Sequence, residues 1–416
     1  MLNLIYEKIK KGFPFTLSIF ILIFTIAISS IHFNATQNLD NININQEQPT
    51  IEKNKEMKAI WVPYMSLEMT NSDYSEASFK EKFDNIIETA KSNNINTLIA
   101  HVRPFGDALY PSSYFPWSHI ISTKQGMDPG YNPLQYMIES THKANMELHA
   151  WINPLRIKSS ISPKELCDNN QCNIWKNEDK STNSDRILEW ENCEYYNPAY
   201  EEVRQLIING IMEIVNNYDI DGIHLDDRFY PTSNPNFDKI SYENYCNNLE
   251  NASNLLSIFD WRLNNINCLI TGIYSAIKSS NANVKFGISP EGNIQNSLDL
   301  GADVYTWGKQ DGYVDYLCPQ VYFSLNHPTL PYTKAVDEWK KIICNPNIKF
   351  YIGLGIYKAG SDADDGTWKL SNDILKQQIE YGRNISCDGF MLYSLDYLDN
   401  AQTKKEIENV MKIFNN

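Results

Sequence analysis

Basic residues are scarce in this sequence. The chain carries 36 Lys and Arg against 51 Asp and Glu, which gives a formal net charge of −15 at pH 7. Proteins that bind DNA or RNA normally present a basic face, so the composition argues against nucleic acid as the main partner. An acidic substrate is still compatible with this charge, because a local cleft can oppose the sign of the whole protein.

The signature motifs of several enzyme classes are also missing. No G-x-G-x-x-G or Walker sequence occurs, which argues against a doubly wound open sheet that binds a nucleotide. No G-x-S-x-G elbow of serine hydrolases is present. A catalytic metal is the main competing chemistry, because His101, His149 and His224 lie on successive predicted strands, but no His-x-His pair accompanies them. The sequence therefore predicts neither a metal site nor a cofactor.

Cysteine is too sparse for a disulfide scaffold, with 8 residues in 416. Cys318 and Cys387 lie in apolar, strand-like runs, where a free thiol behaves as a small buried hydrophobic group. Cys167, Cys172 and Cys193 fall in a polar stretch, and one disulfide bridge among these three is compatible with their spacing.

A long hydrophobic run occurs at the N-terminus. Three lysines precede a stretch without charge, whose apolar part, residues 13–31, matches the ~20 residues that span a bilayer. We therefore predict a signal peptide or signal anchor over residues 1–35 and a polar stalk over residues 36–56. Either alternative places the domain at residues 57–416 outside the cytoplasm, membrane-anchored by the N-terminal helix or secreted.

Short apolar runs and amphipathic helical stretches alternate through that domain. Such alternation predicts parallel strands, and eight units predict a (β/α)8 TIM barrel with extended βα loops. The region between the fifth and sixth runs, residues 296–313, offers only a short helix. The predicted strands are Ala59–Pro63, Thr97–Val102, Leu148–Asn153, Gly222–Asp226, Lys285–Ser289, Tyr316–Val321, Phe350–Leu354 and Gly389–Tyr393.

Acidic residues follow the fourth predicted strand as the pair Asp226 and Asp227. Two adjacent carboxylates are costly to bury without partners, but at a barrel rim their repulsion raises one pKa and makes that group a proton donor near neutral pH. Strand alternation places His224 and Asp226 on one face. The alternative is a structural pair that caps a helix or binds Arg228 or Arg204.

Aromatic residues gather at or just after the strand ends. Flat aromatic faces beside acids and amides are typical of a sugar-binding cleft. The residues are Trp61, Phe105, Tyr110, Trp117, Trp151, Tyr230, Tyr322, Tyr357, Trp368 and Tyr393.

Several long motifs resemble one known family. They are HVRPFGDALYPSSYFPWSH from His101, NPAYEEVRQLIINGIMEIVNNYDIDGIHLDDRFYP from Asn197, then FGISPEGN, YVDYLCPQVYF and GLGIYKAG. Together they resemble the family-ten-like glycoside hydrolases of bacterial envelopes, which include divisome-associated peptidoglycan glycosidases. The resemblance covers residues 57–414. It implies a (β/α)8 barrel that cleaves β-linked amino-sugar glycans, notably peptidoglycan strands lacking stem peptides.

The resemblance also assigns roles to individual positions. Asp226 and Asp227 match the family's paired acids, and Glu291 is a reserve general acid. Arg228 stands where relatives usually have Tyr, and residues 158–196 form an insertion. The predicted substrate-binding residues, some from the motifs and some from their place at strand ends, are Arg103, Asp107, Trp151, Asn153, Arg156, His224, Gln320, Tyr322 and Lys358.

The mechanism suggested by these residues is substrate-assisted. Retaining barrel glycosidases usually place a second carboxylate after strand seven, but that strand is followed here by Gly355-Ile356-Tyr357-Lys358, with no acid. An N-acetyl sugar can supply its own amide oxygen as nucleophile, so that Asp226 and Asp227 need only protonate and orient. Inversion by Asp226 with Glu291 remains open. The alternatives are a catalytically inactive, membrane-tethered glycan-binding protein and a metal-dependent deacetylase.

Overall fold

A computed structural model describes residues 56–69, 73–182, 184–248 and 254–415. The predicted signal segment and all of the predicted stalk except Glu56 lie outside these residues. The described residues belong to one compact unit, Glu56–Asn416. No helix within the described ranges is long and apolar enough to cross a membrane.

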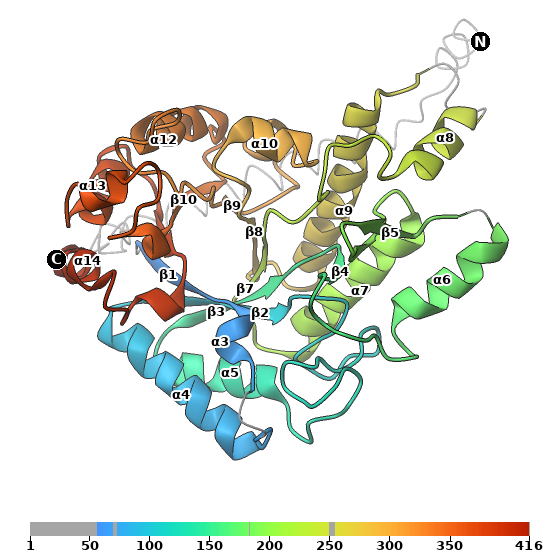
Figure 1. Cartoon of the computed structure of the whole chain (residues 1–416), viewed down its shortest axis with the longest axis horizontal. Coiled ribbons are helices and arrows are strands. Elements are labelled where there is room, and N and C mark those ends of the chain that lie inside the picture. The colour runs from blue at the N-terminus through green and yellow to red at the C-terminus, as the bar shows by residue number, and fades with distance from the viewer. Residues whose placement is uncertain (1–55, 70–72, 183, 249–253, 416) are drawn as a thin grey trace, which may run out of the picture. The chain divides into compact units, whose positions relative to one another are not determined.

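Eight parallel strands close into a barrel in the order β1-β11-β10-β9-β8-β7-β3-β2 (Figure 1). The predicted (β/α)8 barrel is therefore confirmed, and each predicted run overlaps one strand. The sixth run pairs as a continuous strand only over its first two residues, and Gln320 beyond Pro319 forms isolated bridges with Glu291 and Gly353. Pro319 itself has no N–H for the ladder. The strands are β1 Met57–Val62, β2 Thr97–Arg103, β3 Glu147–Ile152, β7 Gly222–Leu225, β8 Lys285–Ile288, β9 Tyr316–Leu317, β10 Lys349–Leu354 and β11 Gly389–Leu392.

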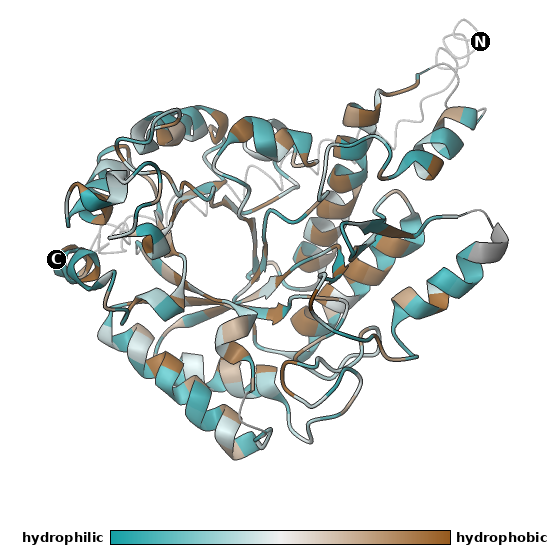
Figure 2. Ribbon diagram, viewed as in Figure 1, coloured by the Kyte–Doolittle hydropathy of each residue, from teal (hydrophilic) through white to brown (hydrophobic). Residues whose placement is uncertain are grey.

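Most of the helices surround the barrel and bury one face against it (Figures 1 and 2). In α12 the buried residues include Tyr332, Val336 and Trp339, at the spacing of a single helical stripe. The longer helices are α4 Glu76–Ser92, α5 Pro133–Lys143, α7 Glu201–Asn217, α8 Lys239–Asn247, α9 Ile258–Ser280, α12 Tyr332–Ile342, α13 Ile374–Asn384 and α14 Lys404–Phe414. Short helices are α3 Tyr64–Leu67, α10 Ile294–Asp299 and α11 Val304–Trp307, with 3-10 turns at Ile356–Lys358, Thr367–Lys369 and Leu395–Tyr397.

A chain of polar side chains runs through the barrel interior. Trp61 donates its indole N–H to Nε2 of His224 at 3.2 Å, and Nδ1 of His224 lies 2.9 Å from the Tyr316 hydroxyl. The same hydroxyl lies 2.9 Å from Nδ1 of His149. Space for the Tyr316 ring depends on Gly287, where a Cβ would come within 2.0 Å of the ring.

The segment predicted as an insertion contains structure that the sequence did not reveal. It holds α6 Gln171–Thr182 and most of a three-stranded antiparallel sheet, ordered β4-β6-β5, with β4 Arg156–Lys158, β5 Ile187–Trp190 and β6 Cys193–Tyr196. The disulfide bridge that the spacing of Cys167, Cys172 and Cys193 allowed is not formed, because all three cysteines are free. Sγ of Cys172 instead lies 3.1 Å from Oε2 of Glu194, and Sγ of Cys167 lies 3.4 Å from Oε1 of Gln125.

Candidate active site

A cavity of about 390 Å³ opens at the carboxyl ends of the barrel strands. Every barrel strand contributes to it, either with its last residues or with the loop that follows. Asp226 and Asp227 are the two carboxylates in its lining, and the other groups are aromatic, amide, hydroxyl or cationic, apart from Pro63 and Met65. The complete lining is Trp61, Pro63, Tyr64, Met65, His101, Trp151, Arg156, Asp226, Asp227, Arg228, Ser289, Gln320, Tyr322, Tyr357 and Tyr393.

Asp226 lies at the floor of this cavity, with 5% of its surface exposed. Its Oδ2 accepts hydrogen bonds from Nε1 of Trp151 at 3.1 Å and from Nδ2 of Asn153 at 3.4 Å. Its Oδ1 accepts the backbone N–H of Arg228 at 3.1 Å. Burial and the neighbouring charge of Asp227 nevertheless raise the pKa of Asp226 to about 6. This carboxyl group therefore exchanges a proton close to neutral pH.

Asp227 has different partners. Its Oδ1 accepts the side-chain N–H of Gln320 at 2.9 Å and lies 3.9 Å from Nε of Arg228. Gln320 is itself fixed by a second hydrogen bond, to the carbonyl oxygen of Ser289 at 3.0 Å. These contacts hold the Asp227 side chain in one orientation beside Asp226, the group whose pKa is raised.

Glu291 does not line the central cavity. It lies in an adjoining cavity of about 390 Å³ that also touches Asp227, Gln320 and Lys358. Its Oε2 accepts the Asn296 side-chain N–H at 2.9 Å. The two cavities share four lining residues, so they form one continuous cleft. Glu291 therefore flanks the acid pair on the side of the β8 loop.

Half of the ten aromatic residues noted in the sequence line the central cavity. These five are Trp61, Trp151, Tyr322, Tyr357 and Tyr393. Four others, Phe105, Tyr110, Tyr230 and Trp368, are buried in the hydrophobic core, and Trp117 packs against that core. The sequence pattern located the correct end of the barrel but could not separate cavity walls from the core beneath the loops.

Three of the predicted substrate-binding residues are buried outside the cavity lining and, within the described residues, form no hydrogen bond with Asp226 or Asp227. His224 is fully buried, and its Nε2 lies 3.2 Å from Nε1 of Trp61 and 3.1 Å from Oγ of Ser289, two residues that line the cavity. Arg103 is 1% exposed, and its guanidinium lies over the Phe115 ring.

Of the other predicted substrate-binding residues, Arg156 and Lys358 line the cleft and Asn153 holds Asp226 in place. Arg156 lines the central cavity while donating to the Pro104 carbonyl oxygen at 3.1 Å. Asn153 is fully buried and contacts Asp226. Lys358 lines the adjoining cavity, but its ammonium group is held by the Tyr322 carbonyl at 2.7 Å and by Asp364 at 2.9 Å.

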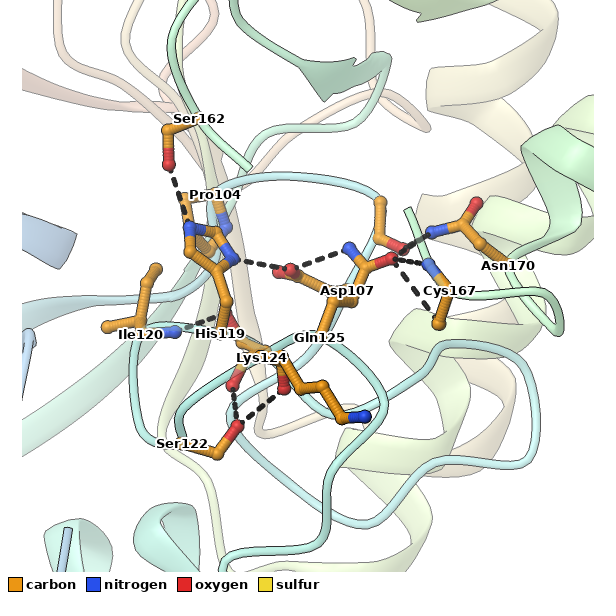
Figure 3. A network of polar contacts seen from close by, with 12 residues as sticks. Pro104, Asp107, His119, Ile120, Ser122, Lys124, Gln125, Ser162, Cys167 and Asn170 are labelled. Atoms are coloured by element: carbon orange, nitrogen blue, oxygen red, sulfur yellow. Dashed lines mark hydrogen bonds and ion pairs between the residues drawn. The ribbon is translucent and has the colours of Figure 1, made fainter. Parts of the chain in front are cut away.

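Asp107, the third buried residue, organises a polar network shown in Figure 3. Its Oδ2 lies 3.1 Å from Nδ1 of His119 and accepts the Gln125 side-chain N–H at 2.9 Å. Oε1 of Gln125 in turn accepts the backbone N–H of Cys167 at 3.0 Å and the Asn170 side-chain N–H at 3.1 Å. The network joins the loop after β2 to the segment 158–196.

The same network has the order of an acyl-transfer triad, since Nε2 of His119 lies 2.7 Å from Oγ of Ser162. An oxyanion site needs free N–H groups beside the nucleophile. Here the Ser162 N–H donates to Ser159 Oγ at 3.0 Å, and the next residue, Pro163, has no N–H. The geometry therefore assigns this network a structural role.

His101 is a cavity residue that the sequence suggested only as a metal ligand. Its ring stacks on Trp151 at a centroid distance of 3.7 Å, and neither ring nitrogen has a hydrogen-bond partner within the described structure. Burial and nearby cations hold its pKa well below the usual value, so the ring is neutral. Within the part of the chain described, no three His, Cys, Asp or Glu side chains lie together in a way that holds a metal ion.

The fold and the acid-bearing cavity define a barrel of the glycoside hydrolase class. A family model described as "Glycosyl hydrolase-like 10" matches residues 56–369. The chain belongs to this family. It is 33% identical over 374 residues to "Glycosyl hydrolase YngK" of Bacillus subtilis, covering 84% of this chain and 70% of that protein.

Two further similarities agree with the family. "Glycosyl hydrolase DigH" of Escherichia coli is 29% identical over 377 residues, covering 83% of this chain and 82% of that protein. The solved glycoside hydrolase domain of PgaB from Bordetella bronchiseptica shares the fold, with a TM-score of 0.55 and 9% identity over 86% of this chain and 98% of that one.

Proposed function

We propose that this glycoside hydrolase acts outside the cytoplasm on β-linked amino-sugar glycans, namely peptidoglycan strands that lack stem peptides. The observation that carries the proposal is the cavity in which Asp226 and Asp227 are the two lining carboxylates, beneath aromatic walls. A sugar ring stacks on such walls, while the paired acids contact one glycosidic bond. The N-terminal segment ties the protein to the membrane side of the envelope or directs its secretion.

The arrangement of the acids favours substrate assistance. A conventional retaining enzyme needs a carboxylate nucleophile on the far side of the bond, and β10 is followed by Ile356, Tyr357 and Lys358. With an N-acetyl sugar, the carbonyl oxygen of the acetamide attacks the anomeric carbon, and the leaving oxygen takes a proton from the enzyme. Water then opens the oxazolinium ring.

The two acids divide these tasks according to their surroundings. Asp226 holds a proton up to about pH 6, and its Oδ1 accepts a single hydrogen bond, which leaves room for that proton. It is therefore the general acid in our proposal. The Asp227 carboxylate, oriented by Gln320 and Arg228, holds the N–H of the acetamide and so positions its oxygen.

Mass spectrometry of glycan strands provides the test. Strands stripped of stem peptides by an amidase are incubated with the full chain, and saccharides with new reducing ends are expected. Asp226→Asn and Asp227→Asn should each lower the rate at least a hundredfold. Asp399→Asn, which changes an exposed acid outside both cavities, is the matched control.

The other outcomes are equally informative. Strands that bind the protein but remain intact would identify a glycan-binding protein without catalysis. Inversion of the anomeric configuration, together with loss of activity in Glu291→Gln, would replace substrate assistance with a general-base mechanism using Glu291. Inhibition by a thiazoline analogue of the oxazolinium ring would support the mechanism proposed.

A further inference from the structure

The cleft does not end at Glu291. A third cavity, of about 640 Å³, shares Asn293, Thr329 and Leu330 with the adjoining cavity that contains Glu291. The shared residues join the adjoining cavity, which contains Asp227 and Glu291, to a groove between α10–α11 and α12. A polymer bound at Asp226 and Asp227 can therefore continue into this groove without leaving the surface.

Three lysines line this outer groove. Lys334 and Lys341 come from α12, and Lys309 follows α11. All three side chains are exposed. Lys334 and Lys341 are seven residues apart, which places them on one helix face, two turns or about 10 Å from each other. This length is close to that of a disaccharide.

These cations lack acidic partners. Within the described residues, neither Lys334 nor Lys341 forms an ion pair, and the Lys309 ammonium lies over the Tyr305 ring at 5.5 Å. Glu338 is the one acid in the groove lining. A local excess of positive charge therefore stands on a protein whose net charge is −15. An anionic ligand gains attraction here that the rest of the surface opposes.

We infer that this groove binds carboxylate groups of the glycan, and that the lysines recognise the lactyl carboxylates of a strand without stem peptides. The inference rests on the proposed function. While a stem peptide is attached, the lactyl group is an uncharged amide, and hydrolysis of that amide releases the carboxylate. The lysines thus distinguish a strand that has been stripped from one that has not.

Binding measurements separate this inference from the catalytic proposal. The probes are short, fluorescently labelled, peptide-free strands and the same strands after methyl esterification. Affinity is measured by anisotropy with Asp226→Asn/Asp227→Asn protein, so that the strands stay intact. In that background Lys334→Ala/Lys341→Ala should weaken binding of the carboxylate strands about fivefold and leave binding of the esters unchanged.

The matched control is Lys404→Ala/Lys405→Ala, which removes two exposed lysines from α14 and the same total charge. Equal losses in both double variants, or equal losses for acid and ester strands, would overturn the inference. Lys334→Arg/Lys341→Arg should restore the preference for carboxylates. If wild-type protein cuts no strand but the lysine-dependent preference for carboxylates is present, the catalytic proposal fails and the inference about carboxylate binding in the groove is supported.

Discussion

Trp151 donates its indole N–H to Asp226 across 3.1 Å, and its ring is stacked on His101. The floor of the cavity is therefore assembled from the ends of β2, β3 and β7. One ring positions the carboxyl group by a hydrogen bond and also forms part of the wall. A substitution at Trp151 therefore alters both the hydrogen bond to Asp226 and the cavity wall.

Trp151→Phe removes that donor and keeps an aromatic ring. Loss of a hydrogen bond to the charged form raises the pKa of Asp226, by about one unit for a bond of this kind. If Asp226 is the general acid, the decline of kcat/KM with rising pH should shift upward by the same amount. A pH profile of strand cleavage measures it, with Trp190→Phe, outside both cleft cavities, as the control. An unchanged profile would contradict the role of this contact.

Asp226→Asn should change how stability depends on pH. The pKa of Asp226 is raised from 3.8 to about 6, so the folded protein holds this proton more tightly than the unfolded chain does. The resulting stabilisation is complete in acid and is lost as the pH rises through about 6. Urea unfolding at pH 4.5 and pH 7.5 should show a loss of about 2 kcal/mol in wild type that the variant lacks. Equal losses of stability between pH 4.5 and pH 7.5 in the two proteins would show that Asp226 does not cause this pH dependence.

Gln320→Leu removes the amide that orients Asp227. The carboxylate then loses its fixed position, and kcat should fall about tenfold while the affinity for substrate changes little. Gln377→Leu is the matched control, because that amide also donates to a carboxylate, Asp373, but from an exposed position of α13. A change confined to KM would indicate that Gln320 binds substrate instead.

Tyr316→Phe tests the polar chain inside the barrel. The variant leaves Nδ1 of both His149 and His224 buried without a partner, which should lower the free energy of unfolding by about 1–3 kcal/mol. Tyr114→Phe, which alters an exposed tyrosine, should have little effect. Unaltered stability in Tyr316→Phe would show that the two imidazoles find other partners.

The barrel was predictable because strand bodies and strand ends differ in composition. Buried runs such as Thr97–Val102 are mostly apolar, and turn residues mark where they stop. Pro319 shortened the sixth strand, although apolar residues continue beyond it, since hydropathy does not register a missing N–H. The small sheet at β4–β6 escaped prediction because its strands are only three or four residues long.

The sequence placed the candidate site at the carboxyl ends of the barrel strands. It did not predict which side chains point into the cavity. Adjacent Asp226 and Asp227 stand out in any sequence pattern. Arg103 and Asp107 look equally suited to bind substrate, yet both are buried, because the loop after β2 folds back over them. His101 lines the cavity, but the sequence suggested it only as a metal ligand. Loop paths are set by contacts between distant segments, which no local pattern contains.

The bonds from Asp107 through Gln125 to Asn170 have a consequence for how such barrels diversify. Neither the loop after β2 nor the segment 158–196 carries a complete set of partners by itself. Grafting one of them onto another barrel would leave buried amide atoms of Gln125 or Asn170 unmatched, whereas transferring both would carry the partners along. Exchange of these segments between relatives should therefore succeed only when both are transferred together.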